Sequence, residues 1–168
     1  VIDSLQIQRG NPNLESYLYY RTSLDGEWSK GIFHTYFSMS YNYKPNAIMD
    51  EKYVEGNKII QTWDNQKNWQ SLTPMIQLRV GPVANMLQFS VSGGLNHYIS
   101  NGNTYKHRYS NWWMDASLSA NWKKFSFMYQ IMTNQNRLVG ETVSGDENAQ
   151  VLMLNYKWKG LRVGAGVI

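Results

Sequence analysis

The chain has 168 residues, a net charge of +4 and no cysteine, and its charged residues make up only 17% of the sequence against 14% aromatic residues. No stretch approaches the roughly 18 consecutive apolar residues of a transmembrane helix, which excludes a helical membrane protein. The positive charge alone would suit a nucleic-acid partner. The lysines and arginines are scattered, however, and several occupy tight turns, so we expect no nucleic-acid binding.

The first two expected strands form a hairpin that follows a lead-in over residues 1–13. The lead-in contains a turn signal at Gly10 and Pro12, and the first strand is expected over about 16–28. The second strand, about 32–43, alternates apolar or aromatic side chains with polar ones over its full length. The two strands are joined by a tight turn at 29–31, directly after Trp28.

Alternation degrades over about 44–70, where we expect a long structured loop. Lys52–Val54 and Lys58–Trp63 could form a hairpin around Gly56-Asn57. The aromatic residues of this loop are candidate ligand contacts, since they could stack on sugar rings or other flat ligands. They could equally pack the loop hairpin on itself, and both interpretations stay open for Tyr53, Trp63 and Trp69.

Two further strands are expected over about 71–81 and 86–99. The first of them is expected to turn at Gly81-Pro82, and the second to bend at Gly93-Gly94. A second polar loop is expected over about 100–108.

The fifth strand has the clearest alternation in the chain. From Trp112 to Trp122 the strand advances ten residues. At about 3.3 Å per residue and a tilt of roughly 45°, this distance covers roughly 24 Å along the axis of a barrel, close to the ~25 Å height of the apolar band of an outer-membrane barrel. Tryptophan begins and ends this apolar stripe, whose members are Trp112, Met114, Ala116, Leu118, Ala120 and Trp122.

A sixth strand from Phe125, a long polar loop over about 135–147, and strands over 148–158 and 161–168 complete the pattern. Short connections alternate with long ones, as in outer-membrane barrels. We therefore predict an all-β fold: an antiparallel up-and-down meander of about eight strands over residues 1–168, forming one segment of a transmembrane β-barrel. The expected aromatic girdle at the lipid interface consists of Trp28, Trp112, Trp122 and Trp158.

Motifs for catalysis are not recognisable in the sequence. His34, His97 and His107 are too scattered for a metal-ligand spacing, and neither a nucleophile elbow nor a phosphate-binding loop occurs. We expect no enzyme activity, no metal and no cofactor.

Several short segments resemble the outer-membrane β-barrel domain of TonB-dependent-receptor-like proteins of the Bacteroidetes type. The matching segments, in order along most of the chain, are Gly10–Leu14, Lys44–Met49, Leu78–Pro82 and Gly140–Thr142.

The resemblance implies a roughly 22-stranded barrel with an N-terminal plug, located in the outer membrane of a Gram-negative cell and importing nutrients. Because the chain has no recognisable plug, we expect it to be an internal or near-C-terminal segment of a longer protein. Its implied partners are outer-membrane lipid, the remaining strands and plug, a surface lipoprotein and an energy-coupling protein.

Two other classes of protein remain open. A soluble eight-stranded β-barrel that binds a small ligand would bury the stripe from Trp112 to Trp122. A self-contained small outer-membrane barrel would instead pair the first strand with the last. The direction in which the stripe faces therefore separates the soluble class from the membrane classes.

Overall fold

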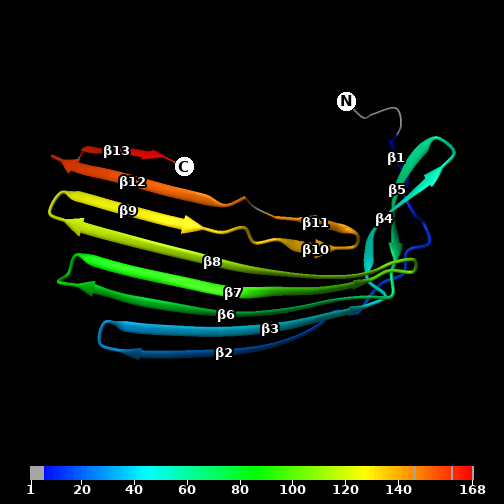
Figure 1. The fold of residues 1–168 in the computed structure, drawn as a ribbon, viewed down its shortest axis with the longest axis horizontal. Coiled ribbons are helices and arrows are strands. Elements are labelled where there is room, and N and C mark those ends of the chain that lie inside the picture. Colours follow the sequence, from blue (N-terminus) through cyan, green and yellow to red (C-terminus); the bar gives the residue numbers. More distant parts are fainter. Residues whose placement is uncertain (1–5, 146, 160, 168) are drawn as a thin grey trace.

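The computed structural model describes residues 6–145, 147–159 and 161–167, and these residues form strands and turns (Figure 1). No helix long and apolar enough to cross a membrane occurs within these ranges. Residues 1–5 of the expected lead-in, Gly160 of the last tight turn and Ile168 of the last expected strand lie outside the described residues.

Eight strands form one large antiparallel sheet in the order β13-β12-β9-β8-β7-β6-β3-β2. The prediction of an antiparallel all-β fold is confirmed. The sheet is open, because within the described residues β2 and β13 each pair on one side only. The strands are β2 (Tyr20–Lys30), β3 (Phe33–Pro45), β6 (Asn68–Val83), β7 (Leu87–Asn101), β8 (Lys106–Trp122), β9 (Phe125–Met132), β12 (Ala149–Trp158) and β13 (Leu161–Val167).

Several strand boundaries differ from those expected: β2 begins at Tyr20 and not at about residue 16, and β6 begins at Asn68 and not at about residue 71. Strand β6 does not turn at Gly81-Pro82 but continues to Val83, with a register irregularity between Val80 and Val83. Strands β7 and β8 extend their pairing into the stretch 100–108, because backbone pairing does not require apolar side chains. The expected bend at Gly93-Gly94 leaves the register of β6 and β7 unchanged.

A second, smaller sheet lies at the end of the large sheet opposite the short turns (Figure 1). It contains the hairpin expected around Gly56-Asn57, formed by β4 (Ile48–Glu55) and β5 (Lys58–Asn65). The lead-in adds β1 (Gln6–Gln8) parallel to β5. At the same end, β10 (Arg137–Val139) and β11 (Thr142–Ser144) form another short hairpin.

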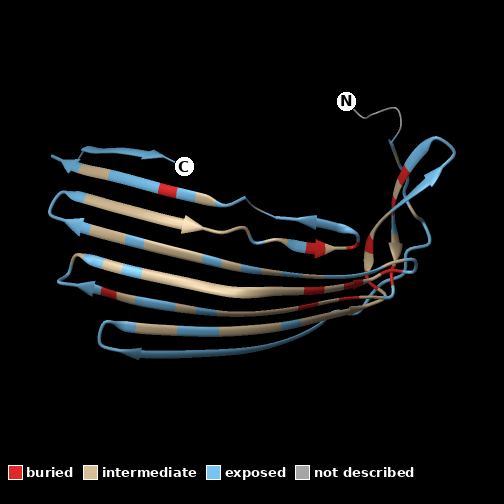
Figure 2. Ribbon diagram, viewed as in Figure 1, coloured by how far each residue is buried: buried red, intermediate tan, exposed pale blue. Residues whose placement is uncertain are grey.

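Most buried residues gather at this same end of the molecule (Figure 2). The packed cluster consists of Ala47, Met49, Trp69, Tyr98 and Leu138. Elsewhere the strands of the large sheet are mainly exposed or half-buried, and no other layer of described residues covers them. Backbone pairing between neighbouring strands, rather than a core, is therefore what joins the large sheet.

Gly94 is a position within the sheet where a close approach requires glycine. A Cβ on Gly94 in β7 would lie 2.6 Å from the carbonyl oxygen of Pro74 and 2.9 Å from Nε1 of Trp113. Trp113 is the direct partner of Gly94 on β8, so its indole occupies the space that a side chain would need. By contrast, a Cβ on Gly26 in β2 would meet nothing within 4 Å.

We therefore expect Gly94→Ala to lower the free energy of unfolding by about 1–3 kcal/mol, as overpacking of a tight site does. The matched variant Gly26→Ala should stay within about 0.5 kcal/mol of the parent. Denaturant titration followed by circular dichroism measures both. Equal stability of the two variants would show that the indole of Trp113 does not constrain position 94.

Candidate functional site

Strand register divides the side chains of the large sheet between two faces of opposite character. Leu118 lies opposite Phe89 on β7 and Tyr129 on β9, and Phe89 lies opposite Val80 on β6. We call this side the apolar face; it includes all of the stripe from Trp112 to Trp122. The other side, the polar face, includes Ser23, Asp25, Ser38, Gln77, Ser90, Ser117 and Gln130.

Large side chains on the apolar face are exposed along most of the sheet. They come from every one of its strands and include Leu24, Phe37, Ile76, Phe89, Met114, Leu118, Phe125, Leu154 and Val163. The acids in these strands, Asp25, Glu27 and Asp115, all lie on the polar face. The result is one continuous hydrophobic surface without a negative charge in the described strands.

The tryptophans expected to form the girdle are all on the apolar face and exposed. Trp28, Trp122 and Trp158 lie near the ends of β2, β8 and β12 that join the short turns. Trp112 is 75% exposed and lies ten residues before Trp122 on β8, toward the opposite end of the strand. The tryptophans therefore lie near both limits of the exposed stripe.

Lysines in the short turns lie over these tryptophans. The Lys123 ammonium is 5.0 Å from the ring centroid of Trp122, and that of Lys159 is 5.7 Å from Trp158. Both lysines adopt positive φ angles, which reverse the chain within a tight turn. An aromatic ring with a charged amine beside it suits a boundary between an apolar and an aqueous phase.

The long loops pack on the polar face at the other end of the sheet. Trp69 of β6 is 6% exposed, its ring lies beside that of Tyr98 of β7, and its Nε1 donates to the carbonyl oxygen of Leu138 at 2.8 Å. Lys44 and Arg137 lie 5.1 and 5.9 Å from the ring centroid of Trp69. Through its hydrogen bond to Leu138, Trp69 connects β6 to the β10–β11 hairpin.

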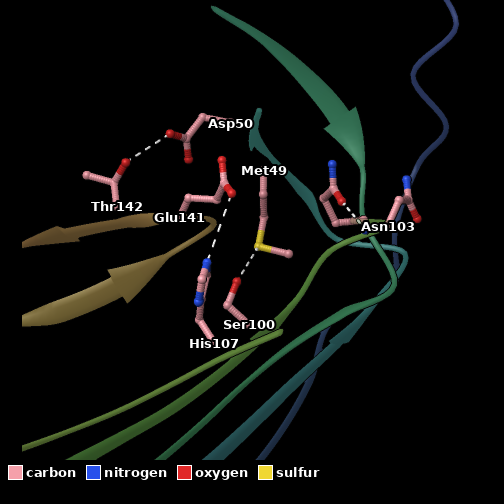
Figure 3. Close-up of polar contacts among 8 residues, drawn as sticks. Met49, Asp50, Ser100, Asn103, His107, Glu141 and Thr142 are labelled. Carbon is pink, nitrogen blue, oxygen red and sulfur yellow. Dashed lines mark hydrogen bonds and ion pairs between the residues drawn. The ribbon is translucent and has the colours of Figure 1, made fainter. Parts of the chain in front are cut away.

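Polar contacts join the two hairpins to the sheet around this cluster (Figure 3). Ser100 donates to the sulfur of Met49 at 3.4 Å, and Thr142 donates to Oδ2 of Asp50 at 3.1 Å. Nε2 of His107 lies 4.0 Å from Oε1 of Glu141. These contacts hold β4, β7, β8 and the β10–β11 turn in one arrangement.

Close approach between the hairpins depends on Gly140 at the β10–β11 turn. Its φ is +61°, and a Cβ there would lie 2.6 Å from Oδ1 of Asp50. The neighbouring carboxyl of Glu51 has a raised pKa, chiefly because burial disfavours its charge and also because Asp64 and Glu141 repel it. Glu51 itself is half-buried, and no group of described residues has the composition of a metal site.

The three expected ligand-contact residues are not brought together. Tyr53 and Trp63 are exposed on β4 and β5, and the Tyr53 hydroxyl accepts a 3.4 Å hydrogen bond from Arg9. Trp69 belongs to β6 and packs in the buried cluster instead of lying in a loop. The cluster around Trp69 includes Met49 of the β4–β5 hairpin as well as residues of β7 and β10, and a ligand-contact role for these three residues stays a prediction.

Sequence reasoning missed the partners of Trp69. The polar-face parity of β6 extends from Gln77 back through Ser71 to Trp69, so alternation alone could have assigned Trp69 to a strand. No comparable pattern indicates Leu138, which is separated from Trp69 by 69 residues.

Comparisons of the chain with protein-family models, with curated proteins and with solved structures found no match.

We expect Trp69→Phe to loosen the β10–β11 hairpin, because the carbonyl of Leu138 loses its buried donor at a cost of about 1–3 kcal/mol. Amide hydrogen exchange over residues 137–144 should become faster. The matched variant Trp63→Phe, at an exposed site on β5, should leave it unchanged. Unaltered exchange in Trp69→Phe would contradict the role of this indole in fixing the hairpin.

Proposed function

We propose that the large sheet is a segment of the wall of a β-barrel in the outer membrane of a Gram-negative cell, with its apolar face in contact with lipid. The observation that carries this proposal is the continuous exposed apolar face. Soluble monomers rarely expose contiguous apolar patches larger than a few hundred Å². The apolar face extends over eight strands, so its area exceeds that of the apolar patches found on soluble monomers.

The dimensions of the stripe on β8 support contact with a bilayer. Trp112 and Trp122 are ten residues apart on this strand. At about 3.3 Å per residue and a tilt of roughly 45°, they span roughly 24 Å along the barrel axis, close to the ~25 Å height of an outer-membrane barrel's apolar band. The tryptophans at its two limits have the position of interfacial aromatic residues.

Open edges favour a barrel completed by further strands. Lipid offers no hydrogen-bond partner for the free N–H and C=O groups of β2 and β13, so both edges need neighbours inside a membrane. A self-contained small barrel would pair β2 with β13, and within the described residues these two strands are not paired with each other. A soluble carrier is disfavoured because its apolar face would have to be enclosed.

The function of the complete barrel is, in this proposal, TonB-dependent uptake of a nutrient, without catalysis. Support comes from the short segments that resemble this class of receptor and from the loop hairpins that pack over the polar face at one end. That end would meet ligand at the cell surface, with a surface lipoprotein as a further partner. The remaining strands, the plug and an energy-coupling protein would complete the transporter.

Quenching of tryptophan fluorescence at known depths in lipid vesicles tests the position of the apolar face. We expect Trp112 and Trp122, identified by the loss of signal in Trp112→Phe and Trp122→Phe, to be quenched at interfacial depth. A tryptophan placed at mid-stripe by Leu118→Trp should be quenched by the deepest probes. The matched substitution Ser119→Trp, one residue along on the polar face, should not be.

Emission that is blue-shifted in plain buffer and insensitive to lipid, from a monodisperse monomer, would contradict the proposal. That result would mean that the apolar face forms the interior of a soluble protein.

A further inference from the structure

A groove of about 710 Å³ interrupts the apolar face near the middle of the sheet. Its floor and walls are almost wholly apolar, and they include Phe37, Ile76, Gly93, Leu95, Trp112 and Met114. The groove crosses β3, β6, β7 and β8 on the side of the sheet that we assign to lipid.

A missing side chain creates this groove. Gly93 of β7 lies directly between Ile76 of β6 and Met114 of β8 in the strand register. Beyond Ile76 in the same register is Phe37, a large side chain. The neighbouring row contains Pro74, which is shorter than the Trp112 two strands away. Large side chains therefore surround Gly93, which has none. The groove follows from the register of the paired strands.

Positive charge lies on the same face, just beyond the groove toward the long loops. Next to Trp112 on this face of β8 comes Ser110, which is 2.7 Å from Nδ1 of His97, and then Arg108 and Lys106. Arg108 is four residues, or about 13 Å, from Trp112 along the strand. Both Arg108 and Lys106 are exposed, and neither forms an ion pair with an acid in the described parts of the chain.

These cations are unusual for the face on which they lie. The other charged residue on the same face of the strands is Lys30, at the short-turn end of β2. The acids Asp25, Glu27 and Asp115 point to the polar face, so none of them compensates the charge of Arg108 or Lys106. The apolar face of β8 therefore has the apolar groove next to Trp112 and, toward the long loops, the positive charges of Arg108 and Lys106 without an ion-paired acid among the described residues.

We propose that this surface binds an anionic phospholipid of the membrane, with an acyl chain in the groove and the phosphate on Arg108 and Lys106. Arginine recognises phosphate through paired N–H donors, and lysine adds a second charge. His97 and Ser110, joined by their hydrogen bond, supply polar groups between the acyl chain and the headgroup. The occupant is a lipid because groove and cations open onto the same lipid-facing surface, so this inference rests on the proposed function.

Trp112 lines the groove and therefore reports on its occupant. The full chain is incorporated into phosphatidylcholine vesicles that contain a small fraction of either brominated phosphatidylglycerol or brominated phosphatidylcholine. The Trp112 signal is the difference between the parent and Trp112→Phe. We expect the anionic lipid to be enriched at Trp112 by about fivefold for each cation that contacts it.

The double variant Arg108→Gln, Lys106→Gln should make the two brominated lipids equally effective at Trp112. The control variant Lys30→Gln removes a cation from the same face at the opposite end of the sheet, and it should leave the preference at Trp112 unchanged.

Equal quenching of Trp112 by both lipids in the parent chain would overturn the lipid site while leaving the membrane-wall proposal intact. A preference that persists in the double variant would also overturn it, because the charge would then come from elsewhere. Quenching by neither lipid would contradict the proposed function itself and, with it, this inference.

Discussion

Backbone hydrogen bonding between strands is the interaction on which the rest of this structure depends. No layer of described residues packs on either side of the large sheet over most of its length, so its neighbouring strands are held chiefly by their backbone hydrogen bonds. Pairing fixes register, and register directs alternate side chains to opposite faces. A slip of one residue in β8 would turn the stripe from Trp112 to Trp122 to the polar face. Every property of the apolar face follows from this register.

The two ends of the molecule are stabilised in different ways. Near the short turns, exposed tryptophans and lysines face outward and little is buried. At the long loops, Trp69, Tyr98 and Leu138 form a small core, and hydrogen bonds join the hairpins to it. A wall that meets lipid can obtain its apolar contacts from the membrane, whereas loops in water must bury their own. This difference in packing agrees with a barrel segment whose loops are exposed to the aqueous phase.

The strands were predictable because each has a period of two, and β8 is the clearest case. Trp69 was assigned to a loop because the breakers after Lys44 obscured the parity that connects it to Ser71. Its contact with Leu138, the position of Gly94 under the indole of Trp113 and the groove at Gly93 arise from neighbouring strands or distant loops. Alternation within one strand contains no information about what lies beside it. The resemblance to a receptor family stays a prediction.

A scan of single cysteines over residues 111–122 would test the central claim most directly, since the chain has no cysteine of its own. Each variant is spin-labelled in lipid vesicles, and its collision rates with oxygen, which concentrates in lipid, and with a water-soluble nickel complex are compared. The account predicts strict alternation, with oxygen dominant at Met114, Ala116, Leu118 and Ala120 and nickel dominant at the residues between them. Equal accessibility of both sets to the nickel complex, or protection of the even-numbered set from both reagents, would contradict it.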